Sequence, residues 1–137
     1  MTDLQLVAKK LALIETSVVE LRSLVRLEAV QEDVRELRFA AYTLHIAIQA
    51  ALDVAAHIVA DNRLGEPQNN RELFELLARY GWISRELMGS LREMVGFRNI
   101  VVHGYERLNA AIVEKILRHH LDDLLQFVSA VRTQLSR

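Results

Sequence analysis

The chain contains no cysteine among its 137 residues. This absence excludes disulfide bonds, thiol catalysis and metal sites built on thiolates. It is also what a reducing compartment favours, so we expect a cytoplasmic protein.

Proline and glycine are scarce, with 1 and 5 residues, while hydrophobic residues make up 51% of the chain. Such a composition is typical of a packed helical domain and argues against a disordered protein. A chain of 137 residues is long enough to bury one core. We therefore expect a single domain over residues 1–137.

The chain also lacks an excess of charge, since 17 basic and 18 acidic residues leave a formal net charge of -1. A neutral balance gives no overall attraction for nucleic acid, so RNA binding would need a local basic patch. Charges interrupt every apolar run of the first 24 residues. This pattern predicts neither a signal peptide nor a membrane span there, and we expect no membrane partner.

Apolar residues recur at steps of three and four, which is the pattern of amphipathic helices. The expected helices cover residues 4–25, 31–61, 71–79, 84–98 and 109–135, and residues 62–70 form the clearest loop. Residues 39–60 are apolar on nearly every side and should form the most buried helix. No strand pattern occurs, so the sequence predicts an all-α, up-and-down bundle of about five helices.

One segment carries residues suited to cutting RNA without a metal. Arg98 and His103 have four residues between them, Asn99 follows the arginine, and Tyr105 lies two beyond the histidine. A histidine can take the proton of a 2′-hydroxyl group or give one to the leaving oxygen. An arginine can grip a phosphate and stabilise the charge of the transition state, and Asn99 could donate one more hydrogen bond.

The pair of arginine and histidine alone is weak support for a site. With 14 arginines and 5 histidines, about one or two matches to this spacing arise by chance. Arg38 and His45 are such a match, and we expect a structural role for His45. In a continuous helix, residues five apart lie about 140° around the axis, so a helix break at Gly104 would help to bring His103 toward Arg98.

The longer pattern from Met94 to Tyr105 resembles the signature of the HepT family of HEPN domains: an arginine, four residues, a histidine, any residue and a tyrosine. The segments 44–60 and 64–77 look like the family's central helix and its loop and third helix. The resemblance implies a HEPN-type bundle and a ribonuclease toxin of a type VII-like toxin–antitoxin pair. Such a toxin would need no cofactor and no metal, and it would act on RNA rather than DNA.

The same resemblance implies specific roles and partners. Arg98 and His103 would be catalytic, and two protomers would pair so that their motifs share one cleft. The auxiliary role of Asn99 rests on its side-chain chemistry alone. An MntA-like nucleotidyltransferase antitoxin would transfer AMP to Tyr105. The added phosphate would bring negative charge beside Arg98 and compete with RNA for it.

Alternatives remain open from the residues themselves. Asp53, His57 and Asp61 lie at steps of four and could line up as metal ligands, although two carboxylates and one imidazole make an incomplete site. Asp53 could instead hold Arg98 or His103 in place from the neighbouring helix. The protein could also be a non-catalytic partner of a nucleotidyltransferase that binds a nucleotide or protein, or a structural helical dimer.

Overall fold

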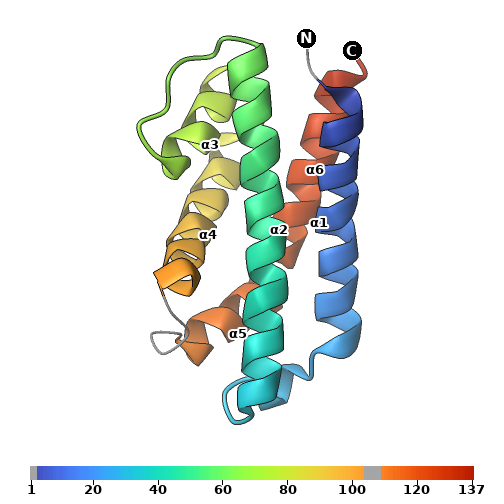
Figure 1. Cartoon of the computed structure of the whole chain (residues 1–137), viewed down its shortest axis with the longest axis vertical. Coiled ribbons are helices and arrows are strands. Elements are labelled where there is room, and N and C mark those ends of the chain that lie inside the picture. Colours follow the sequence, from blue (N-terminus) through green and yellow to red (C-terminus); the bar gives the residue numbers. More distant parts are fainter. Residues whose placement is uncertain (1–2, 104–108) are drawn as a thin grey trace.

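The computed structural model describes residues 3–103 and 109–137, with residues 101–103 as backbone only. These residues contain no strand, and they form the helical bundle of Figure 1. Its α-helices are α1 (Leu4–Leu24), α2 (Val34–Asp61), α3 (Asn70–Arg79), α4 (Arg85–His103), α5 (Ala110–His119) and α6 (Leu121–Leu135). A short 3₁₀ helix, η1 (Leu27–Ala29), follows α1. The predicted all-α bundle is confirmed.

The first two helices form an antiparallel hairpin (Figure 1). The Asp3 side chain accepts a hydrogen bond from the backbone N–H of Leu6, and the Asp33 side chain does the same for Arg35. Both aspartates therefore satisfy free N–H groups at a helix start. The apolar stripe of α1 is buried from Val7 to Leu21, whereas Leu4 at its beginning is exposed.

Helix α2 is the centre of the bundle, as the sequence predicts. All the other α-helices pack against it, and Figure 1 shows α3 and α4 on one side of it with α1 and α6 on the other. By length and composition α2 could cross a membrane, but 61% of its most apolar window is buried inside the fold. Burial in the bundle accounts for its apolar composition.

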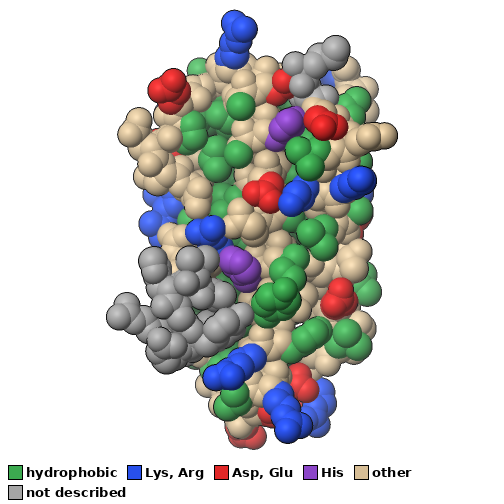
Figure 2. All heavy atoms as spheres, viewed as in Figure 1, with side chains coloured by type: hydrophobic (Ala, Val, Ile, Leu, Met, Phe, Trp, Pro, Cys, Tyr) green, Lys and Arg blue, Asp and Glu red, His purple; other side chains and the backbone are tan. Residues whose placement is uncertain are grey.

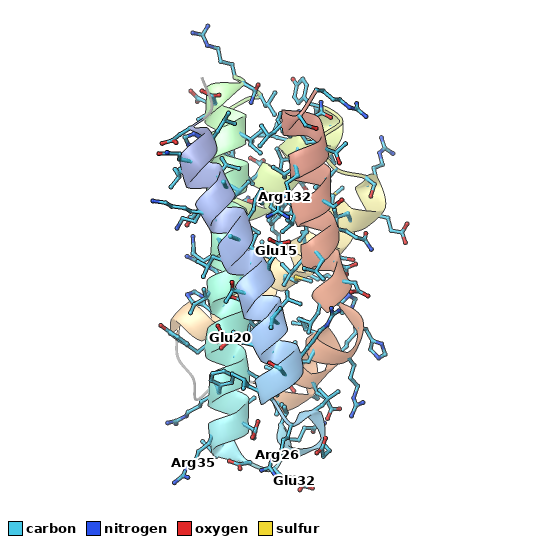
Figure 3. The ribbon with its side chains drawn as sticks, turned by 90° about the vertical axis from the view of Figure 1, so that its right-hand side faces the viewer. Glu15, Glu20, Arg26, Glu32, Arg35 and Arg132 are labelled. Carbon is cyan, nitrogen blue, oxygen red and sulfur yellow. The ribbon has the colours of Figure 1, made fainter. Side chains whose placement is uncertain are left out.

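Helix α6 closes the bundle mainly against α1 and α4. The guanidinium of Arg132 forms two hydrogen bonds with the Glu15 carboxylate, at 2.8 and 2.7 Å, and Figure 3 shows these side chains between the two helices. This contact holds the pKa of Glu15 below its usual range, chiefly through the hydrogen bonds from Arg132. On the inner side, the rings of Phe127 and Phe74 meet edge to face at 5.9 Å.

The prediction of one long final helix is wrong. Helix α5 ends at His119, and α6 begins at Leu121 after His120, whose φ of -125° is not helical. The His120 ring lies 2.9 Å from an Asp123 carboxylate oxygen in the first turn of α6. The spacing of apolar residues continues across the break, which is why the sequence pattern does not reveal it. The break raises the number of α-helices in the described part of the chain to six.

Asparagine side chains cap both α3 and α5. Asn69 accepts a hydrogen bond from the backbone N–H of Glu72 at the start of α3, and Asn109 accepts from two backbone N–H groups at the start of α5. In the first turns of α5, Ile112 is exposed and Val113 is buried.

Candidate functional site at Arg98

Helix α4 carries Arg98 and Asn99 toward its end. The hydroxyl of Ser84 accepts a hydrogen bond from the backbone N–H of Leu87 at the start of this helix. Buried apolar residues then fix its orientation, and both Arg98 and Asn99 are half-buried. The apolar residues are Leu87, Leu91, Met94, Val95 and Phe97.

Arg98 is held by the central helix. Its Nε donates a hydrogen bond to Oε1 of Gln49 on α2 at 3.0 Å. One terminal nitrogen donates a longer bond, 3.3 Å, to Oδ1 of Asn99. No carboxylate of the described residues pairs with this guanidinium. The Nε edge is thus fixed while the terminal amino groups keep hydrogen-bonding capacity for an anion.

Gln49 belongs to a relay of polar groups that crosses three helices. Its Nε2 donates to Oδ1 of Asp53 at 2.9 Å, one turn along α2. The other oxygen of Asp53 lies 3.0 Å from Nζ of Lys10 on α1. Asp53 orients the amide of Gln49, so the amide oxygen faces Arg98 rather than the solvent.

The sequence placed Asp53 near the site but missed Gln49. Asp53 reaches Arg98 only through Gln49, so the direct contact between them is absent. The missed signal was in the sequence: His45, Gln49, Asp53 and His57 follow each other at steps of four within an apolar segment. Such a step places side chains on one face of a helix.

His45 lies one turn before Gln49 on this polar face. Its Nδ1 is buried and has no hydrogen-bond partner among the described residues. Burial lowers the pKa of His45, and the positive charge of Arg98 lowers it further. The structure therefore associates His45 with Arg98, whereas the sequence grouped it with Arg38, which is exposed.

The possible metal ligands on α2 are engaged separately. Asp53 contacts Gln49 and Lys10, and Nε2 of His57 accepts a hydrogen bond from the backbone N–H of Asp3 at 3.0 Å. Within residues 3–100 and 109–137, no group of three or more histidine, aspartate or glutamate side chains is placed to hold a metal ion.

The remaining predicted site residues are described only in part. The backbone of α4 is helical through His103, but the His103 side chain lies outside the described residues. So do Tyr105 and the predicted helix break at Gly104. The structure thus brings together Arg98, Asn99, Gln49 and Asp53 from α2 and α4.

The helical bundle around α2 has the fold of solved HEPN toxins. A solved toxin–antitoxin complex with AMP-PNP contains a chain that is 31% identical, with a TM-score of 0.89 over 94% of this chain and 98% of that one. The tri-AMPylated HEPN toxin of Shewanella oneidensis, solved in complex with its MNT antitoxin, is 32% identical, with a TM-score of 0.87 over 97% and 99%.

The sequence comparisons agree with the fold. The family model described as Ribonuclease HepT-like matches residues 14–131, so the chain belongs to the HepT-like ribonuclease family. The mRNA nuclease HepT of Shewanella oneidensis is 42% identical over 86 residues. This matched segment is 63% of our chain and 65%, just under two thirds, of that relative. The predicted family is confirmed.

The environment of His45 predicts a pH dependence of stability. Because its folded pKa lies below the ordinary value of 6.5, the unfolded chain binds this proton more readily. The contribution is fully present above the unfolded pKa and is lost as the pH falls toward the folded one. Urea unfolding at about pH 7.5 and about pH 5.5 should show a larger loss of stability for the unmodified protein than for His45→Gln.

His119→Gln provides the matched control, since it removes an exposed imidazole from the end of α5. It should leave the pH dependence of the unmodified protein in place. Equal pH dependence in His45→Gln and the unmodified protein would show that His45 is not held in a desolvated position beside Arg98.

Proposed function

We propose that this protein is the toxin of a toxin–antitoxin pair, a metal-independent endoribonuclease in which Arg98 and His103 are catalytic. The observation that carries the proposal is the hydrogen bond from Nε of Arg98 to Gln49. It leaves a half-buried guanidinium whose terminal nitrogens keep donors for an anion and have no carboxylate partner among the described residues. That arrangement suits a phosphate, and membership of the HepT-like family supports an RNA phosphate.

The chemistry requires proton transfer and charge stabilisation, but no cofactor. The 2′-oxygen of the RNA attacks the adjacent phosphorus as its proton leaves, and the bond to the 5′-oxygen breaks. A 2′,3′-cyclic phosphate forms, and the 5′-oxygen takes up a proton. His103 is suited to these proton transfers, and Arg98 stabilises the extra negative charge, with Asn99 as an additional donor.

Two protomers together can bring the two catalytic side chains face to face. The α4 backbone is helical from Arg85 through His103, so Arg98 and His103 start about 140° apart around one helix axis. Two copies that pair through this region would let Arg98 of one protomer face His103 of the other. A homodimer with a shared RNA cleft is therefore part of the proposal.

The proposed partner is a nucleotidyltransferase of the MntA kind. The similar solved toxins are in complexes with antitoxins, and one of them is tri-AMPylated. In this chain we assign AMP transfer to Tyr105, seven residues after Arg98. The negative phosphate of AMP would occupy the position of an RNA phosphate and block cleavage. The proposed pair acts in the cytoplasm, on RNA and not on DNA.

A non-catalytic role is the second candidate. The net charge of -1 provides no general attraction for RNA. In this alternative, the Arg98 site would bind a nucleotide for a nucleotidyltransferase partner without cutting RNA.

Arg98→Ala and His103→Ala should each lower the rate of RNA cleavage by at least about a hundredfold, since each removes a transition-state interaction. Cleavage of a fluorescent oligoribonucleotide in EDTA measures this effect. Arg38→Ala is the matched control, because it alters the second pair with the same kind of spacing, and it should cleave normally. Full activity of both site variants, with the helical fold retained, would contradict the catalytic roles.

Co-expression with a cognate nucleotidyltransferase of the MntA kind should increase the intact mass of this protein by one or more AMP groups. Tyr105→Phe should abolish the increase, because it removes the acceptor oxygen and keeps the ring. Tyr42→Phe, which alters an exposed tyrosine of α2, should retain it. An unchanged mass increase in Tyr105→Phe would place the modification elsewhere.

A further inference from the structure

We propose that a hollow beside Arg98, between the start of α3 and the outer side of α4, binds a nucleotide of the RNA next to the one that is cut. Its volume is about 360 Å³, and it is lined by Asn69, Asn70, Arg71, Val95 and Asn99. This inference rests on the proposed ribonuclease function and assigns part of its substrate site. It adds a basic residue that the motif around Arg98 does not contain.

Arg71 is the cation of the hollow. It belongs to the first turn of α3, and its side chain lies across α4, where Nε donates a long hydrogen bond of 3.4 Å to the backbone carbonyl of Arg92. No carboxylate of the described residues pairs with it. The neighbouring carboxylates of α3 are engaged elsewhere, since Glu72 accepts from the backbone N–H of Gln68 and Glu75 pairs with Arg92. The Arg71 charge is therefore available to an anion.

Gly96 makes room for this guanidinium. A Cβ atom at position 96 would lie 3.0 Å from a terminal nitrogen of Arg71, which is closer than ordinary contact. Gly96 is two residues before Arg98 on the same helix. The absence of a side chain there thus lets Arg71 lie against α4 close to the proposed catalytic arginine.

Asparagine amides complete the hollow and connect it to Arg98. Oδ1 of Asn69 is fixed by the backbone N–H of Glu72, at 3.0 Å, so its amino group is left to donate. Asn99 both lines the hollow and accepts a hydrogen bond from Arg98. A ligand in the hollow would therefore lie next to the phosphate at Arg98.

These groups match the chemistry of single-stranded RNA. A guanidinium binds the phosphate, while amides can bind the 2′-hydroxyl group or a base edge as donor and acceptor. Only Val95 among the five lining residues is apolar, which favours a nucleotide over an apolar side chain of a protein partner. Figure 2 shows basic side chains on the α4 side of the face it views, although the chain as a whole is neutral.

Binding of a single-stranded oligonucleotide with 2′-O-methyl groups, which cannot be cleaved by the 2′-oxygen, tests the hollow directly. Arg71→Ala should weaken its affinity by about tenfold, as expected for one charge-assisted contact. The slope of log affinity against log salt should become shallower by about 0.7, the value for one phosphate of a single strand. With cleavable RNA, KM should rise while kcat is retained.

Two matched controls, Arg85→Ala and Gly89→Ala, show whether an effect on binding depends on the position of the change rather than on the loss of any positive charge or on any glycine substitution in α4. Arg85→Ala removes an exposed arginine at the start of the same helix α4 and should bind as the unmodified protein does. Gly96→Ala should weaken binding by a smaller factor than Arg71→Ala, because it displaces the guanidinium and keeps the charge. Gly89→Ala makes the same change on α4 where a Cβ meets nothing within 4 Å, and it should have no effect on binding.

The results distinguish this inference from the ribonuclease proposal. Absence of RNA cleavage by the unmodified protein would contradict the proposed ribonuclease function. Binding of the uncleavable oligonucleotide would still test whether the hollow binds a nucleotide. Unchanged affinity and salt slope in Arg71→Ala would overturn the inference. So would a loss of antitoxin binding in Arg71→Ala without a loss of RNA binding, because the hollow would then contact protein.

Discussion

The site depends on one interaction, the hydrogen bond by which Gln49 of the central helix holds Nε of Arg98. Helix α2 is packed by every other α-helix and can carry few polar side chains without a cost in stability. The polar side chains that α2 carries at steps of four lie on one face of the helix, and Arg98 contacts this face through Gln49. Asp53 and Lys10 fix the amide of Gln49, so a surface ion pair on α1 and α2 helps to set the direction of an arginine on α4.

This arrangement explains how a neutral protein can present a site for an anion. The terminal nitrogens of Arg98 are not neutralised by a carboxylate of the described residues, and His45 beside it has a lowered pKa, so it adds little positive charge at neutral pH. Arg71 contributes a second available guanidinium across Gly96. The basic character is therefore local, as a chain with a net charge of -1 requires.

The sequence predicted the helical class, the buried central helix and the family, because apolar periodicity and the motif around Arg98 are local signals. It missed the break at His120, where apolar spacing continues although the backbone does not stay helical. It also offered Asp53 as one residue that could hold Arg98 or His103, whereas the register of α2 against α4 places Gln49 against Arg98. That register follows from packing of the two helices, which no local pattern specifies. The structural role expected for His45 stays a prediction.

The most direct test of this account is the turnover rate of Gln49→Leu on RNA. Leucine keeps much of the volume but cannot accept the Arg98 hydrogen bond, so kcat should fall by about tenfold to a hundredfold with little change in KM. Gln126→Leu, which makes the same change at an exposed position of α6, should keep its activity. An unchanged kcat in a folded Gln49→Leu would contradict the claim that α2 positions Arg98 for catalysis.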